Sequence, residues 1–256
     1  MPCWISTCGL SDMNIAILIT NTDDSAFAHA RPHDGEKFAD LIHLVRPGWS
    51  CVPFWVCRGV FPEDIQSFDG VMITGSPASV NADLPWMLRL QALIRGMITA
   101  RLPLFGACFG HQLIAKVLGA PIVPNPQGWG HGLLDVRRVG LTPWAGPDRE
   151  LALYGSHIEQ VGAVPEGAQV VFEGPGCAVA GFAIGTSLFT VQHHPEMTHQ
   201  FITDLVEHYA DEVGAEVTEK ARASLRCRAD RRVFAEEIAR FFEYAEAHVM
   251  PEQGGW

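Results

Sequence analysis

The sequence predicts an α/β fold in which a doubly wound, mostly parallel sheet is flanked by helices. Short apolar runs alternate with longer helix-like stretches, which is the pattern of buried strands joined by helices. The chain has 256 residues, of which 48% are hydrophobic and 18% charged, and this suffices for one domain with a full core. We therefore expect a single domain over residues 13–250, preceded by an N-terminal extension over residues 1–12.

The first half of the chain shows this alternation most clearly. Pro85 stands in the first turn of an amphipathic stretch, where its missing N–H costs nothing, and Gly119 ends the next such stretch. The apolar runs predict strands at residues 14–20, 51–57, 70–74 and 102–107, and the stretches between or after them predict helices at residues 36–45, 85–100 and 109–118.

The pattern changes after residue 121 to shorter strands separated by Gly and Pro turns. Gly185 and Thr186 are typical of a hairpin turn. After His194 the chain is predicted to be helical to about residue 249, with a break near Gly214, and the basic run at residues 222–232 is interpreted as a solvated helix face. The strands predicted in this region lie at residues 133–139, 151–156, 169–172, 178–184 and 188–192.

Charge and composition argue against several classes of function. The net charge of −11 disfavours a general affinity for nucleic acid, because phosphate binding depends on Lys and Arg. The sequence has no apolar run of the roughly 18 to 20 residues that span a bilayer. Its first twelve residues lack the basic start and apolar middle of a secretory signal, so we expect a cytoplasmic protein. The seven cysteines include no C-x-x-C pair suited to zinc or thioredoxin chemistry, and most are expected to be reduced core thiols.

One cysteine stands between an apolar strand and a helix, in the pattern Gly106-x-Cys108-x-Gly110. A nucleophile on such a sharp turn has a strained backbone and needs small neighbours. The N–H groups and dipole at the start of the helix favour the thiolate, so Cys108 is predicted to be unusually nucleophilic. Phe109 would offer its backbone N–H to an oxyanion, and Gln112 lies one turn on, where its amide could meet a substrate. Taken alone, the pattern equally suits a buried core thiol beside glycines that allow close packing.

A histidine and a carboxylate follow the last predicted strand, in the segment LFTVQHHPEM. A cysteine nucleophile needs a base and a third group that fixes the imidazole tautomer, and His194 and Glu196 have these chemical types. Functional groups gather beyond the carboxyl ends of the strands in α/β sheets, so this pair is expected to meet Cys108. His193 is the competing base, but adjacent residues of an extended segment point to opposite sides, so only one of the two can face the cysteine.

The same segment has two other interpretations. Pro195 and Glu196 suit the first turn of a helix, which is compatible with the role of Glu196 beside a base. A metal site of His193, His194, Glu196 and His199 is disfavoured, because the proline breaks the helix that would bring these ligands onto one face. We therefore expect neither a metal nor another cofactor.

Three segments, in the order of the chain, resemble motifs of the class I (triad) glutamine amidotransferase family. They are VMITGSPASV, similar to the family's oxyanion strand and loop, GACFGHQ, similar to its nucleophile turn, and VQHHPE, similar to its His-Pro-Glu segment. The resemblance implies a flavodoxin-like fold in which Cys108 forms a γ-glutamyl thioester, His194 acts as general base and then acid, and Glu196 orients His194. It also implies that Gly75 and Phe109 supply the backbone N–H groups that bind the oxyanion.

A fourth segment, YGSHIEQV, is similar to a family segment in which Ser-His is followed by Asp. The similarity implies that Ser156 and His157 line the glutamine pocket, although Glu159 here stands in place of the Asp. The likeness covers residues 14–198, and the helical end at residues 201–249 is like that of stand-alone members related to the glutaminase domain of GMP synthase. The sequence has no P-loop or other ATP motif, so no synthase half is expected within the chain.

Three functions stay open at this point. The protein could hydrolyse the γ-amide of glutamine or of a γ-glutamyl compound by itself, as a glutaminase or γ-glutamyl peptidase does. It could be a glutaminase subunit that delivers ammonia to a separate synthetase, or a non-catalytic binding domain of the same fold. A binding module needs no orienting carboxylate beside a base, so we favour hydrolysis of a small-molecule γ-glutamyl amide.

Overall fold

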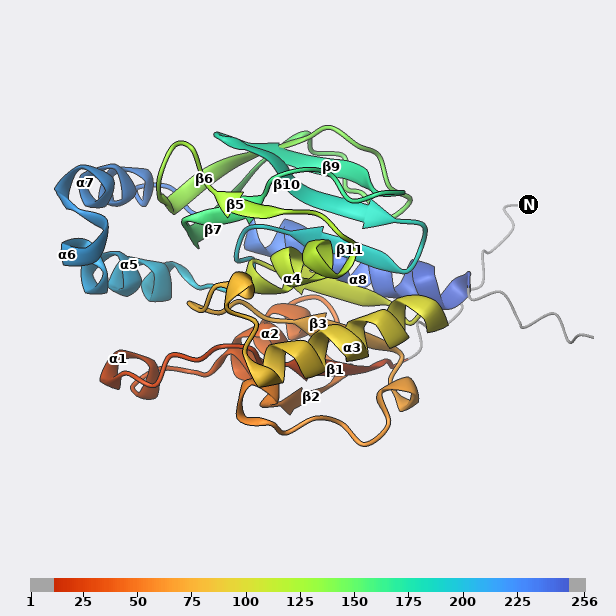
Figure 1. The fold of residues 1–256 in the computed structure, drawn as a ribbon. Helices are drawn as coiled ribbons and strands as arrows, with labels where there is room; N and C mark the ends of the chain where they lie inside the picture. Colours follow the sequence, from red (N-terminus) through yellow and green to blue (C-terminus); the bar gives the residue numbers. More distant parts are fainter. Residues whose placement is uncertain (1–11, 249–256) are drawn as a thin grey trace, which may run out of the picture.

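The centre of the protein is a nine-stranded sheet, seen in a computed structural model that describes residues 12–248 (Figure 1). Five neighbouring strands are parallel, and four more continue the sheet with antiparallel pairing. The predicted α/β fold, with a large and mostly parallel sheet flanked by helices, is confirmed. The N-terminal extension expected over residues 1–12 lies outside the described residues, except for Asp12. The parallel strands are, in spatial order, β2 (Ser50–Phe54), β1 (Asn14–Leu18), β3 (Gly70–Ile73), β4 (Leu104–Ala107) and β11 (Leu188–Val191), followed by the antiparallel β10 (Cys177–Ile184), β9 (Gln169–Gly174), β6 (Gly130–Arg138) and β7 (Glu150–His157).

Helices cover both faces of the parallel strands (Figure 1). Successive residues of β1 alternate between two apolar cores, because side chains of a strand point to opposite faces: Ile15 and Ile17 lie in one core, Ala16 and Leu18 in the other. Strands buried on both faces form near-continuous apolar runs, which is why they were predictable. The first core is closed by α2 (Asp34–His43) and α8 (Arg231–Ala247), and the second by α3 (Pro85–Ala100) and α4 (Phe109–Val117).

Shorter elements surround the carboxyl ends of the parallel strands. A small apolar cluster that includes Tyr154, Met197, Ile202 and Leu205 packs the helices after residue 198 against the end of the antiparallel strands. These helices are α5 (His199–His208), α6 (Ala210–Val213) and α7 (Ala215–Ser224). The remaining elements are α1 (Ala26–His29), the strand pair β5 (Ile122–Pro124) and β8 (Glu159–Val161), and three 3-10 turns at Val56–Arg58, Ile65–Ser67 and Val80–Ala82.

The structure corrects the sequence-based elements in two places. The strand predicted at residues 51–57 ends at Phe54, and the chain then forms a 3-10 turn closed by Gly59 at φ 83°. The basic run at residues 222–232 is not one helix face, because residues 225–230 link α7 to α8. In this link the backbone N–H of Asp230 donates to the carbonyl of Ala152 in β7, and the Asp230 carboxylate accepts from the Ala152 N–H, so the segment is held against the sheet.

The helix α1 and the strands β5 and β8 were not predicted. Each has only three or four residues, too few for a periodic pattern to be recognised. Among residues 12–248, none of the helices is both long enough and apolar enough to span a membrane.

Candidate active site

Cys108 lies at the turn between β4 and α4, with φ 48° and ψ −105°. A non-glycine residue at positive φ is strained, and this strain is sustained by very close packing around the turn. A Cβ atom on Gly110 would lie 2.5 Å from the carbonyl oxygen of Ile73, and one on Gly106 would lie 2.8 Å from the carbonyl carbon of Gly110. Both glycines of the predicted pattern are therefore required by geometry.

His194 and Glu196 form a hydrogen-bonded pair beside this turn. The ring nitrogen Nδ1 of His194 lies 2.7 Å from Oε1 of Glu196, and both side chains are buried. The backbone N–H of His194 donates to the carbonyl of Tyr154 at 2.8 Å, which anchors the segment to β7. Burial lowers the pKa of His194, but the neighbouring Cys108 and Glu196 outweigh burial and raise this pKa well above its usual value.

His193 is buried and packs against a different ring. Its ring centroid lies 6.1 Å from that of His157, with the two planes nearly perpendicular. Burial, with nearby histidines, holds the pKa of His193 well below its usual value, so this residue is neutral near pH 7. In the described structure the carboxylate partner belongs to His194, as the Pro-Glu that follows it suggested.

Gly75 lies next to both the predicted nucleophile, Cys108, and the predicted base, His194. A Cβ atom there would lie 2.7 Å from Cε1 of His194 and 3.6 Å from Cβ of Cys108, so the position has room only for glycine. The carbonyl of Thr74 accepts from the Thr20 hydroxyl at 2.9 Å and from the Gly110 N–H at 3.1 Å. Because the C=O and N–H of a trans peptide point in opposite directions, these bonds fix the direction of the Gly75 N–H. Its role as an oxyanion donor stays a prediction.

Phe109 is the first residue of α4, where backbone N–H groups have no partner within the helix. Its own side chain is buried and stacks on Trp86, with ring centroids 5.6 Å apart. The side chain thus locks the start of the helix, and only the backbone of Phe109 is a candidate for the predicted oxyanion contact.

A cavity of about 560 Å³ opens at this site, above the carboxyl ends of the parallel strands. Most residues predicted from the sequence line it together: Gly75, Cys108, Gln112, Ser156, His157, His194 and Glu196. The hydroxyl of Ser156 lies 3.1 Å from Nδ1 of His131, and Nδ1 of His157 lies 3.1 Å from the carbonyl of Glu159. Burial lowers the pKa of His157 to about 4, so its ring is neutral near pH 7.

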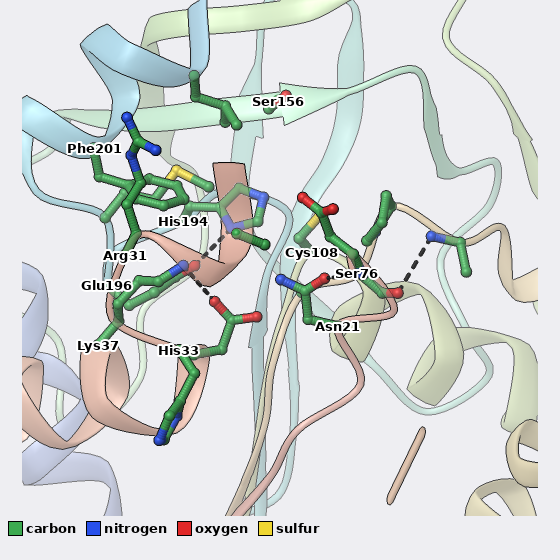
Figure 2. A pocket seen from close by; sticks show the side chains of 18 of the residues that line it. Asn21, Arg31, His33, Lys37, Ser76, Cys108, Ser156, His194, Glu196 and Phe201 are labelled. Atoms are coloured by element: carbon green, nitrogen blue, oxygen red, sulfur yellow. Dashed lines mark hydrogen bonds and ion pairs between the residues drawn. The ribbon is translucent and has the colours of Figure 1, made fainter. Parts of the chain in front are cut away.

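The structure adds lining residues that sequence reasoning missed. Figure 2 shows Arg31, Lys37 and Phe201 beyond His194, and Asn21 near Ser76. Lys37 lies in α2 and Phe201 in α5, whereas Arg31 and Asn21 lie in the loops on either side of α1. Only Phe201 is near a recognised motif, five positions after Glu196. No local signal marks them, because a cavity wall is defined only when separate elements pack together.

Gln192 was also missed, although a signal for it existed. It is fully buried, and its side-chain nitrogen lies 3.7 Å from Sγ of Cys108. It precedes His194 by two residues, and alternate residues of an extended segment face the same side. Gln192 could therefore have been predicted as a site residue, because it is a polar residue at the end of an apolar strand and faces the same side as His194.

Among residues 12–248, we find no group of three or more His, Cys, Asp or Glu side chains placed to hold a metal ion. His199, one of the four ligands considered for a metal site, instead places Nδ1 2.9 Å from the hydroxyl of Tyr154. The arrangement seen here is that of an α/β protein with a cysteine on a strained strand-to-helix turn, beside a buried histidine–glutamate pair.

The chain belongs to the class I glutamine amidotransferase family. The family's sequence pattern, described as "Glutamine amidotransferase class-I", matches residues 58–212. It is 28% identical over 147 residues to a glutamine amidotransferase-like protein of Schizosaccharomyces pombe (57% of this chain, 59% of the relative). It is 26% identical over 200 residues to gamma-glutamyl peptidase 3 of Arabidopsis thaliana (74% of this chain, 80% of the relative). It is also 32% identical over 148 residues to GMP synthase [glutamine-hydrolyzing] of Aeropyrum pernix, covering 57% of this chain but only 28% of that protein.

The fold agrees with solved structures of the same kind. A glutamine amidotransferase from Thermotoga maritima superimposes with a TM-score of 0.73 and 19% identity, covering 91% of this chain and 97% of that one. At this level of identity the likeness concerns the fold.

Proposed function

We propose that the protein is a cysteine-dependent hydrolase that cleaves the γ-amide of a γ-glutamyl compound. The observation that carries this proposal is the His194–Glu196 pair, with a 2.7 Å hydrogen bond, beside the strained Cys108. A histidine that holds its proton next to a cysteine supplies a nucleophilic thiolate, and the carboxylate fixes which ring nitrogen faces the sulfur. Membership of the glutamine amidotransferase family supports the choice of substrate class.

The reaction proceeds in two steps through an acyl-enzyme. The Cys108 thiolate attacks the γ-carbonyl carbon, and the tetrahedral oxyanion is stabilised by the backbone N–H groups of Gly75 and Phe109. The C–N bond then breaks as His194 gives its proton to the leaving nitrogen, which leaves a γ-glutamyl thioester and free ammonia or amine. Water next attacks the thioester while His194 takes its proton. The C–S bond breaks, glutamate departs, and the thiolate beside protonated His194 is restored.

The γ-glutamyl half is held on the side of Gln112, Ser156 and His157. These residues line the cavity together with Cys108 and are fixed by hydrogen bonds to neighbouring groups. The side-chain nitrogen of Gln112 already donates to the carbonyl of Glu159, so its oxygen is the atom left for a substrate. The two neutral rings of His131 and His157 keep this side free of fixed positive charge.

The leaving amine extends toward α2 and α5. There Nζ of Lys37 lies 2.6 Å from Oδ1 of Asp34 and 3.8 Å from the ring centroid of Phe201. This part of the cavity lining is therefore fixed in position, and the charge of Lys37 is neutralised by Asp34. A cavity of about 560 Å³ falls within the range of roughly 300–1,000 Å³ found for sites of drug-sized ligands. The space therefore accommodates an amine larger than ammonia, which favours a γ-glutamyl peptide or amide over glutamine alone. The similarity to a gamma-glutamyl peptidase over most of that protein's length supports this choice.

A second candidate function is that of a glutaminase subunit serving a separate synthetase. The similarity to GMP synthases over 28–30% of their length supports this alternative. Such subunits would waste glutamine if they ran freely, and are expected to be nearly inactive until a partner closes the site. The third possibility, a non-catalytic binding domain, has no use for the buried His194–Glu196 pair.

Steady-state assays on the purified chain distinguish these functions. We expect release of amine from γ-glutamyl p-nitroanilide or a γ-glutamyl dipeptide without any partner, and no release from the matching α-glutamyl compounds. Cys108→Ala is the control for contaminating activity. Turnover of no γ-glutamyl compound by the protein alone, together with strong activation by an added synthetase, would replace this proposal with the subunit function.

A further inference from the structure

We propose that Gln192 is a positioning residue for Cys108, with its side-chain amide donating a hydrogen bond to the sulfur. The inference rests on the proposed function in one respect only, that Cys108 is the nucleophile. Three contacts carry it: Gln192 Nε2 to Cys108 Sγ at 3.7 Å, Gln112 Nε2 to Gln192 Oε1 at 3.1 Å, and Gln112 Nε2 to the Glu159 carbonyl at 2.8 Å.

The direction of both amides follows from the backbone carbonyl of Glu159. A carbonyl oxygen can only accept, so the side-chain atom of Gln112 that lies 2.8 Å from it must be the nitrogen. The same nitrogen lies 3.1 Å from the side chain of Gln192, which must therefore present its oxygen there. The nitrogen of Gln192 is then left facing the sulfur. One fixed acceptor thus orders a chain of two amides that ends on the nucleophile.

An N–H group aimed at the sulfur favours the thiolate over the thiol, because the charged form is the stronger acceptor. Gln192 is fully buried and Gln112 is 5% exposed, so solvent does not compete for these bonds. The titratable group beside Cys108 is His194, with Glu196 behind it, and the start of α4 adds its dipole. The Gln192 contribution differs from these because an amide carries no charge. It holds the sulfur in place whether or not His194 has given up its proton.

The strand register explains why this residue reaches the sulfur. The backbone N–H of Gln192 donates to the carbonyl of Ala180 in β10 at 2.8 Å, and that of Cys108 donates to the carbonyl of Val191 at 2.9 Å. The first bond joins the end of β11 to β10, and the second joins it directly to the nucleophile turn. The same register that brings His194 to Cys108 therefore also brings Gln192, two residues earlier.

The test measures the reactivity of Cys108 toward iodoacetamide between pH 5 and 9.5, with modification of each cysteine followed by peptide mass spectrometry. Gln192→Met keeps the length of the side chain and removes the donor. Gln160→Met is the matched control, because Gln160 is a buried amide that donates to the Gly176 carbonyl at 2.8 Å and does not line the cavity. Circular dichroism confirms that each variant is folded.

We expect Gln192→Met to slow alkylation of Cys108 about tenfold at pH 6 to 7, the value for a weak hydrogen bond to a charged group, and to leave the rate at pH 9.5 nearly unchanged. Gln160→Met should follow the wild-type profile throughout. Gln112→Met should show a smaller loss in the same pH range. The double variant should be no worse than Gln192→Met, because both changes break one chain of contacts.

The proposal is overturned if Gln192→Met and Gln160→Met give the same profile within twofold at every pH. Should Gln192→Met not fold, Gln112→Met decides in its place, and an unchanged profile for that variant overturns the proposal equally. Alkylation requires no substrate, so failure of the proposed function shows separately, as an absence of γ-glutamyl turnover in a wild-type protein whose Cys108 still reacts.

Discussion

Nδ1 of His194 donates to Oε1 of Glu196 across 2.7 Å, while the other carboxylate oxygen of Glu196 is buried and has no hydrogen-bond partner among the described residues. All the carboxylate's hydrogen bonding in the described structure is therefore directed at one imidazole. Burial of a carboxylate is costly, and here its one hydrogen bond to His194 and the nearby charge of Arg231 offset that cost.

Glu196→Gln should reduce kcat/KM for a γ-glutamyl amide by about 10²–10⁴-fold while the protein stays folded. Glu196 contributes to the raised pKa of His194, so its loss lowers that pKa. The protonated imidazole is lost as pH rises through the pKa of His194, and the alkaline limb of the pH–rate profile should therefore move to lower pH. If kcat/KM falls by the same factor at every pH, so that the alkaline limb stays at the same pH, the role assigned to Glu196 is contradicted.

His194→Asn should nearly stop acylation, whereas His193→Phe should be tolerated. His193 packs against His157 and is neutral, so an aromatic ring of similar size replaces it without removing a base. Single-turnover acylation with γ-glutamyl p-nitroanilide measures both variants. The reverse pattern would show that the register of the segment after β11 differs from the one described.

Cys108 should be the cysteine modified by a glutamine-like electrophile near pH 7, and Cys108→Ser should abolish turnover by several orders of magnitude. Burial raises the pKa of Cys51 and of Cys177 to about 12, so these thiols stay protonated and unreactive. Peptide mapping after labelling gives the answer. Modification mainly at Cys51 or Cys177 would contradict the assignment of Cys108 as the nucleophile.

Gly110→Ala should destabilise the protein by about 1–3 kcal/mol, because its Cβ would collide with the backbone of Ile73. The matched control is Gly96→Ala in α3, where a Cβ meets nothing within 4 Å and the position is exposed. That substitution should stabilise the protein by roughly 0.5–1 kcal/mol through helix propensity. Urea denaturation of the two variants measures both effects, and equal changes in both would refute the steric argument.

Stability should fall on acidification from about pH 6.5 toward pH 4. Burial lowers the pKa of His111 to about 3 and those of His131 and His157 to about 4, so the unfolded chain binds more protons than the folded one in this range. The free energy of unfolding therefore rises with pH between 4 and 6.5, by up to about 3 kcal/mol per group. His111→Gln should flatten this slope, whereas replacing the exposed His248 should not. A slope unchanged in His111→Gln would contradict the prediction.

The sequence by itself determined the class of fold and predicted the strand-to-helix turn at Cys108. Strands buried on both faces and amphipathic helices leave patterns within a few residues, and Gly106 is needed by the nearby backbone of Gly110, whereas Gly110 is needed by its contact with the distant Ile73. The spacing of His194 and Glu196 could likewise be recognised, since the two residues contact each other across only two positions. Elements of three or four residues, such as β5 and β8, escaped because a period cannot be established over so short a length.

Only the tertiary structure decided what surrounds these groups. Gln192 reaches Cys108 because two parallel strands 84 positions apart have one particular register. Lys37 and Phe201 share a cavity wall because α2 and α5 pack beside the carboxyl ends of the same strands. Such contacts depend on the relative placement of distant segments, which local propensity does not encode, and they give the site its shape.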